Sequence, residues 1–351
     1  MIKYVLDERN LRTQKAETIA RAKFMLQSLE PEIFQFLDTI PYAMINGEAL
    51  SVTAYGDVGY RTSMDFDFLV SVRHSKAIKE IFFNHGYVEF LYDKEGNPRK
   101  PTRKEQIMLI NANRLTAFEK LTDKGIKLSF DFNTDIFWGE YDGKKIDIDE
   151  FVADAETVDI HGFKIKMLTD VKCFIQTCLH HYNLMNSPFY LFEPRKIVLS
   201  ECWFQDIYSL YINKICSKKS AIEKFVYDFE LQDEFYYMLY YTSVIFQDEE
   251  LYQFADTFKT ESGVKKLEQF GLTDSERKIW PISFEERMNH PQLFKVLKPL
   301  MSESDLEKII RNSTRSTYRM EMSTDYTYNP YYYEKERDEK AASYLKEFIK
   351  K

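Results

Sequence analysis

The sequence predicts an α+β protein in which a sheet flanked by helices is followed by a helical domain. Two segments, residues 64–70 and 126–133, alternate apolar and polar side chains as half-buried strands do. Residues 169–258 instead keep helical spacing over most of their length. Aromatic residues make up 16% of the 351 residues, whereas only 11 are Gly and 10 are Pro. This composition excludes a disordered chain and favours helices joined by short loops.

Four regions are expected along the chain. The first, residues 1–40, carries helical spacing within 11–39, and Pro31 opens its second helix at 32–37. These helices are expected to cover the sheet. The remaining regions are a sheet domain at 41–166, a helical domain at 167–270, and a helical, Tyr-rich C-terminal extension at 271–351.

Residues 42–70 are the stretch in which the spacing of residues suggests chemistry. A short apolar run at 42–45 predicts a strand that ends in a turn at Gly47, and residues 48–55 have a composition compatible with a helix. A loop containing glycines then leads to the strand predicted at 64–70. The order is therefore strand, tight turn, short helix, loop and strand.

Two carboxylates follow one face of the predicted strand 64–70. Side chains two residues apart share a face, so Asp65 and Asp67 lie about 7 Å apart along it. Such a pair is suited to a hard divalent cation, and Mg²⁺ completes its shell with water and phosphate oxygens. A metal site of this kind implies a nucleotide. The turn at Gly47 would let the backbone approach phosphate, with free N–H groups at the start of the next helix.

The rest of the sheet domain supplies a third carboxylate. The segments 117–121 and 126–133 predict a hairpin, and alternation in its second strand puts Asp131 on the same face as Asn133. Asp131 would complete a triad with Asp65 and Asp67 if the two strands are neighbours. The other expected elements are a helix at 75–85, a strand at 87–92, a charged turn at 93–102, a further element at 106–111, and a hairpin at 158–160 and 163–165.

The order of these residues resembles the polymerase-β-like nucleotidyltransferase superfamily. It is most similar to a bacterial branch of largely uncharacterised nucleotidyltransferases. The family pattern falls on Asn46-Gly47-Glu48-Ala49-Leu50, Tyr55, Arg61 and Asp65-Phe66-Asp67-Phe68-Leu69-Val70. The resemblance implies a mixed sheet, a helical domain that closes over the nucleotide, and metal ligands and catalytic groups at Asp65, Asp67 and Asp131. It also implies that Gly47 lies under the phosphates, next to Asn46 and Glu48.

Two positions depart from the pattern. Asn46 stands where the branch usually has Lys, and Glu48 stands where most of the superfamily has Ser. Both changes make a triphosphate site less cationic. Arg61 could neutralise phosphate or fix the carboxylates, or it could form a salt bridge that anchors its loop.

The helical domain carries three further candidates for contacts with substrate. Helices are expected at 169–186, with Thr169 as the cap, and at 195–214, 221–229 and 234–258. His180 and His181 lie on the first of these helices, either in the cleft or as hydrogen-bonded helix residues. Asp206 could reach the cleft, or it could serve as a cap or ion-pair partner.

The end of the chain gives weaker signals. Residues 302–312 predict a helix capped by Ser302 or Ser304, residues 316–333 are rich in Tyr without a clear period, and a charged helix at 334–351 ends the sequence.

In the helical domain, Tyr236 and Tyr240 share one helix face, as do Tyr237 and Tyr241. We expect both pairs to pack in the core or at a domain interface rather than to stack on bases.

Charge and cysteine content limit the partners. A net charge of −8 argues against a long nucleic acid as substrate. The four cysteines form no Cys-x-x-Cys pair, so a zinc site is not expected. The sequence has no signal peptide and no apolar run long enough to span a membrane, so we expect a cytoplasmic protein with no membrane partner.

The leading functional hypothesis is a nucleotidyltransferase. It would move AMP from ATP, or another NMP from its NTP, to a hydroxyl-bearing acceptor with Mg²⁺ or Mn²⁺ as cofactor. The acceptor would be a small molecule, a peptide or a protein. One alternative is a catalytically inactive binding or regulatory module with the same fold, favoured by Asn46 and Glu48. Another is γ-phosphoryl transfer on the same scaffold.

Overall fold

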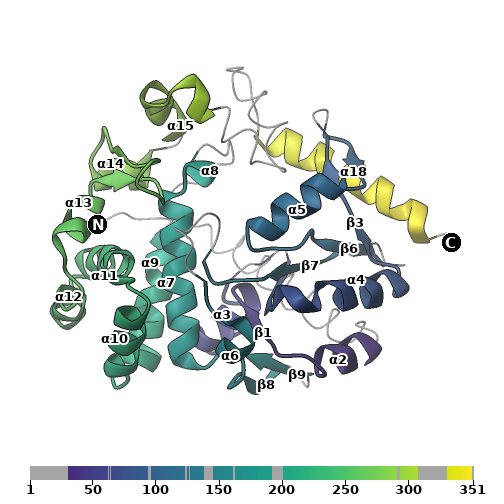
Figure 1. Ribbon diagram of the computed structural model, residues 1–351, viewed down its shortest axis with the longest axis horizontal. Helices are drawn as coiled ribbons and strands as arrows, with labels where there is room; N and C mark the ends of the chain where they lie inside the picture. The colour runs from purple at the N-terminus through teal and green to yellow at the C-terminus, as the bar shows by residue number, and fades with distance from the viewer. Residues whose placement is uncertain are drawn as a thin grey trace.

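The computed structural model describes most of the chain and shows a sheet region beside a helical region (Figure 1). The described residues are 31–61, 63, 65–93, 96–122, 125, 127–137, 145–160, 163–191, 201–290, 293–306 and 330–349. The sheet and its helices lie on the right of the view and the helices from α7 to α15 on the left. The first helix expected within 11–39 lies outside the described residues.

A seven-stranded mixed sheet forms the centre of the right-hand region. Its strand order is β3-β6-β7-β2-β1-β9-β8. β1 pairs with β2 in antiparallel fashion, and β2 pairs with β7 in parallel. The strands are β1 Tyr42–Ile45, β2 Phe66–Val70, β3 Val88–Glu89, β6 Phe118–Leu121, β7 Lys127–Asn133, β8 Glu156–Ile160 and β9 Phe163–Met167. The expected α+β class and both expected hairpins are confirmed.

Alternation along β2 and β7 separates two cores. Phe66, Phe68 and Phe130 pack with apolar residues of the helices on one side of the sheet. Leu69 belongs to a second core that continues into the helical region and includes Phe174 of α7. Asp67 and Asp131 alternate with the phenylalanines, so they lie on the side of the sheet that Leu69 shares.

Helices cover both sides of the sheet. α2 and α4 contribute to the phenylalanine-rich core, whereas α3 follows β1 and contacts α7 and α9. A capping box formed by Thr102 and Glu105 begins α5. The helices of this region are α2 Pro31–Leu37, α3 Gly47–Tyr55, α4 Ser75–Asn84, α5 Arg103–Asn111 and α6 Ile148–Phe151.

The helical region consists mainly of short helices around two longer ones. The helices are α7 Asp170–Asn186, α8 Pro188–Leu191, α9 Glu201–Leu210, α10 Lys219–Asp228, α11 Gln232–Phe246, α12 Glu249–Asp256, α13 Glu261–Lys266, α14 Phe284–Asn289 and α15 Leu293–Leu297. A π-helical turn, Tyr211–Ile215, continues α9. Of the described helices, none is long and apolar enough to span a bilayer.

Several predicted boundaries were wrong. The single helix predicted at 234–258 is broken at Gln247, which has a φ of +54°, and Asp248 caps the new helix α12 through the Leu251 amide. The strand predicted at 87–92 is split between β3 and the short β4, Leu91–Tyr92. β4 pairs with β5, Pro98–Arg99, inside the expected charged turn. Thr169 precedes α7 but makes no side-chain cap.

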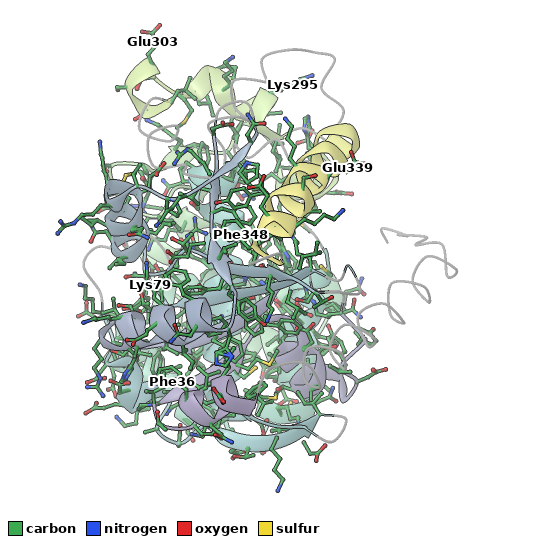
Figure 2. All side chains as sticks on the ribbon, turned by 90° about the vertical axis from the view of Figure 1, so that its right-hand side faces the viewer. Phe36, Lys79, Lys295, Glu303, Glu339 and Phe348 are labelled. Atoms are coloured by element: carbon green, nitrogen blue, oxygen red, sulfur yellow. The ribbon has the colours of Figure 1, made fainter. Side chains whose placement is uncertain are left out.

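The last described helix, α18, Pro330–Ile349, returns to the sheet. Its buried residues Ala341 and Leu345 pack against Phe90 and Leu121. Figure 2 shows α18 on the side of the molecule that faces the viewer, with Phe348 labelled. Residues 316–329 of the Tyr-rich segment lie outside the described residues, and 330–333 are helical.

Substitution of Ala341 by Asp should detach α18 from the sheet, because it would place a carboxylate against Phe90 and Leu121 at a cost of several kcal/mol. Limited proteolysis should then cleave within 330–349 while the rest of the fold survives. Ser343→Asp adds the same charge at an exposed position of the same helix and is the control. Equal cleavage of the two variants would contradict this packing.

Candidate active site

Strand pairing brings the predicted carboxylates together. Asp67 is the direct partner of Asp131 in the parallel pair of β2 and β7, and of Ile45 in the antiparallel pair of β2 and β1. Neighbouring strands lie about 4.8 Å apart, so Asp67 and Asp131 are adjacent on one face. β2 begins at Phe66, so Asp65 lies just before the strand rather than within the strand predicted at 64–70.

Asp67 is the electrostatic centre of this group. Burial raises the pKa of Asp67 well above its usual value, and the negative charges of Asp65 and Asp131 raise it further. Hydrogen bonds from the Asn46 and Asn133 side chains act in the opposite direction. The Asn133 amide nitrogen lies 3.3 Å from Asp67 Oδ1. Burial and the charges of Asp65 and Asp131 therefore all disfavour a negative charge on Asp67 in the absence of a cation.

This donor set fits a hard divalent cation that completes its shell with other ligands. Within the described ranges, no group of three or more His, Cys, Asp or Glu side chains is arranged to hold a metal ion. Mg²⁺, however, commonly takes only one or two protein carboxylates and keeps water and phosphate oxygens. A cation beside Asp67 would relieve the repulsion from Asp65 and Asp131.

Asn46 links the carboxylates to the helical region. Its side chain hydrogen-bonds to Asp67, and its Oδ1 accepts a hydrogen bond of 2.9 Å from Gln176 Nε2 on α7. The backbone of Asn46 has φ +52° and ψ −155°, which is costly for a residue other than Gly. The strained residue is thus held by contacts on both sides, at the position where the resembled family has Lys.

Gly47 is required by a close approach of the loop that carries Asp65. A Cβ at Gly47 would lie 2.7 Å from Ser63 Oγ, and the residue has a φ of +29°. Ser63 Oγ in turn donates a hydrogen bond of 2.6 Å to the Asp65 carbonyl. The lack of a side chain at Gly47 thus lets Ser63, and with it the backbone at Asp65, approach the start of α3.

Glu48 is buried in the first turn of α3, with 1% of its surface exposed. A carboxylate is favourable at the positive end of a helix dipole. Glu48 therefore places a carboxyl group at the end of α3 at which phosphate was expected.

Arg61 pairs with Asp206 in the helical region. Asp206 is completely buried and also accepts a hydrogen bond of 2.7 Å from the Tyr55 hydroxyl. Of the two roles considered for Arg61, the structure describes the salt bridge that anchors its loop. This salt bridge and the Tyr55 hydrogen bond join α3 and its following loop to α9.

One of the two histidines, His181, contacts the same buried carboxylate. His181 Nε2 lies 3.0 Å from Asp206 Oδ2, and the His181 ring stacks on Trp203. Burial lowers the pKa of both histidines, and the positive charge of Arg61 lowers it further. The pKa of His180 falls to about 4. Both rings are therefore neutral near pH 7, and His181 serves as a hydrogen-bonded helix residue.

The lowered pKa of His180 predicts a loss of stability in acid. In the unfolded chain a His has a pKa near 6.5, so between pH 6.5 and about 4 the unfolded state binds a proton that the folded state does not. The neutral His180 side chain therefore contributes its full stabilisation above pH 6.5. As the pH falls, this stabilisation is lost and the free energy of unfolding decreases by roughly 1–3 kcal/mol. Urea unfolding at pH 7 and pH 5 should show a smaller decrease for His180→Gln than for the natural protein. His290→Gln is the control, and the same decrease in all three proteins would refute the assignment.

The main residues that the sequence analysis missed are polar partners of the candidates. Alternation placed Asn133 on the strand face of Asp131, but no contact with Asp67 was predicted for it. Gln176 carries no local signal because its partner Asn46 is 130 residues away, and nothing local indicates the approach of Ser63 to Gly47. The candidate residues form two groups at the two ends of α3. The first group consists of Asn46, Gly47, Glu48, Asp65, Asp67 and Asp131. The second, near the other end of α3, consists of Arg61, His180, His181 and Asp206.

Comparison with known proteins gives a family match over more than half of the chain. A family model described as "uncharacterised nucleotidyltransferase" matches residues 5–247. Among solved structures, an antigenic nucleotidyltransferase-like protein from Paracoccidioides brasiliensis is 17% identical, with a TM-score of 0.30, over 61% of this chain and 88% of that chain. The Megavirus polyadenylate synthase is 16% identical, with a TM-score of 0.26, over 61% of this chain and 39% of that one. No curated protein matches the chain.

Proposed function

The chain belongs to the uncharacterised nucleotidyltransferase family, and from that premise we propose that it transfers a nucleoside monophosphate, AMP in the first instance, from a nucleoside triphosphate to a hydroxyl group. The observation that carries the proposal is the register that makes Asp67 and Asp131 direct neighbours, with Asp65 close enough to raise the pKa of Asp67. Nucleotidyl transfer needs acidic groups in this arrangement because they hold metal and accept a proton.

Each carboxylate has a distinct role in this proposal. Asp65 and Asp67 would hold Mg²⁺ or Mn²⁺, which when bound neutralises charge on the phosphates. Asp131 would accept the proton of the acceptor hydroxyl. The acceptor oxygen forms a bond to the α-phosphorus, and the bond to the pyrophosphate leaving group breaks. Most of the rate enhancement would come from positioning and charge neutralisation.

The acceptor is proposed only as a class, namely a hydroxyl-bearing small molecule, peptide or protein side chain. The net charge of −8 disfavours a long nucleic acid, whose phosphates would meet an acidic protein.

A second candidate is a non-catalytic binding module. It is favoured by Asn46, which replaces a cation and is already engaged by Asp67 and Gln176, and by the buried Glu48 at the start of α3. Both residues reduce the positive charge available to a triphosphate.

Calorimetry with product analysis separates these candidates. The nucleotidyltransferase should bind a non-hydrolysable ATP analogue in the presence of Mg²⁺ and release pyrophosphate from ATP when an acceptor is supplied. Release of ADP would instead identify γ-phosphoryl transfer. Absence of binding with all four ribonucleotides and both Mg²⁺ and Mn²⁺ would overturn the proposal.

A further inference from the structure

We propose that the exposed ring of Tyr60 is a stacking surface for the base of the nucleotide. The inference rests on the proposed function, because it concerns the same ligand. It assigns a role to a residue outside the carboxylate group and predicts where the nucleoside lies relative to α3.

The loop after α3 runs back along one face of that helix. Gly47, Ser51 and Tyr55 are four residues apart and therefore share a helix face. Ser63 packs on Gly47, and the Ser51 hydroxyl accepts a hydrogen bond of 3.0 Å from the Arg61 amide. The loop thus passes from the end of α3 back to its beginning.

Tyr60 lies in this loop at the end of α3 that is remote from the carboxylates. Its ring stacks on Tyr55, with the centroids 3.9 Å apart and the planes inclined by 15°. Its hydroxyl accepts a hydrogen bond of 3.0 Å from Gln205 Nε2 on α9. The ring is therefore held on one face and at its hydroxyl before any ligand binds.

Tyr60 nevertheless keeps 51% of its surface exposed. A tyrosine that is fixed in this way and still half exposed is pre-organised for a planar partner. Stacking on a fixed ring costs little side-chain entropy, because the ring does not have to be ordered on binding. Every base has a π face, so such a surface does not require a particular base.

The distance between the two ends of α3 suits the length of a nucleotide. Gly47 and Tyr55 are eight residues apart, which corresponds to about 12 Å along a helix axis. Asp65 and Ser63 are near Gly47, whereas Tyr60 is against Tyr55. A nucleoside triphosphate with its phosphates at the carboxylate end would therefore extend its base toward Tyr60.

The experiment compares binding of a nucleotide with binding of a ligand that lacks the base. Non-hydrolysable ATP analogue and inorganic tripolyphosphate are each titrated, with Mg²⁺, into the natural protein, Tyr60→Ala, Tyr60→Phe and Tyr227→Ala. Tyr227 is the matched control because it is also 51% exposed and its hydroxyl is also hydrogen-bonded, to the Thr257 carbonyl.

Tyr60→Ala should weaken binding of the nucleotide by about 5- to 150-fold, the range for loss of one base–aromatic stack. Binding of tripolyphosphate should be unchanged, and Tyr60→Phe should keep most of the nucleotide affinity. Equal affinities of Tyr60→Ala and the natural protein for the nucleotide would overturn the stacking role while leaving the proposed function intact. Failure of the natural protein to bind either ligand would overturn both. Equal weakening of the two ligands would place Tyr60 in the architecture of the phosphate site and refute base stacking.

Discussion

Replacement of Asp67 by Asn is expected to abolish nucleotidyl transfer and to raise the thermal stability of the metal-free protein at neutral pH. The loss of activity should be at least about a thousandfold, as for removal of an essential charged group. The gain in stability follows from the raised pKa of Asp67, because the folded state disfavours its ionised form. The gain in stability originates first in the burial of the Asp67 carboxylate and then in the negative charges of Asp65 and Asp131.

Proton binding by Asp67 determines how the stability of the folded protein changes with pH. Above the usual pKa of an aspartate, the folded protein holds a proton on Asp67 more tightly than the unfolded chain does. Stability is therefore lost as the pH rises through the raised pKa of Asp67. Asn removes the charge and can still hydrogen-bond to Asn46 and Asn133. Each kcal/mol gained in the free energy of unfolding raises the midpoint of thermal unfolding by about 2–4 °C.

Thermal unfolding at pH 7, with and without Mg²⁺, tests this expectation. Mg²⁺ should raise the midpoint of the natural protein, because a ligand bound only by the folded state stabilises it, and should leave Asp67→Asn unchanged. Asp274→Asn is the control, since Asp274 is 98% exposed and its ion pair contributes little. A metal-free midpoint below that of the natural protein, or retained turnover, would contradict the assignment.

The alternation of polar and apolar residues was sufficient to predict the part of the candidate site that lies on strands. Alternation fixes which residues share a face, so Asp67 and Asp131 could be expected on one side of the sheet if their strands were neighbours, and the pairing of β2 with β7 meets that condition. Gly47 was also identified from sequence, although its physical reason is the contact with Ser63.

Long-range polar contacts could not be predicted in the same way. Asp206 meets Tyr55 and Arg61 across about 150 positions of sequence, and no periodicity in either segment specifies that pairing. The break at Gln247 was missed because helical spacing continues through it, although Asp248 followed by two glutamates is a signal for a helix start. The return of α18 to the sheet depends on a few apolar residues, including Ala341, in an otherwise charged helix.

The second large effect is expected for Gly47→Ala. The new Cβ would lie 2.7 Å from Ser63 Oγ and 3.1 Å from Ser63 Cβ, so Ser63 must move. Because Ser63 is hydrogen-bonded to the Asp65 carbonyl, Asp65 should move with it. A displacement of about 1 Å at a reacting group can cost about a hundredfold in rate, and we expect a loss of this size in transfer activity.

Gly56→Ala provides the matched control for backbone strain. Gly56 also has a positive φ, +71°, but a Cβ there would meet no atom within 4 Å. The Gly56→Ala variant should lose about 1–2 kcal/mol of stability and keep its activity.

Adding Ser63→Gly to Gly47→Ala removes both close contacts and should restore part of the activity, although the strain at φ +29° remains. If Gly47→Ala and Gly56→Ala lost the same activity, the contact between Gly47 and Ser63 could not be what positions Asp65. Recovery on removal of the Ser63 side chain would instead show that glycine is needed at this turn to avoid Ser63 and so keep Asp65 in place.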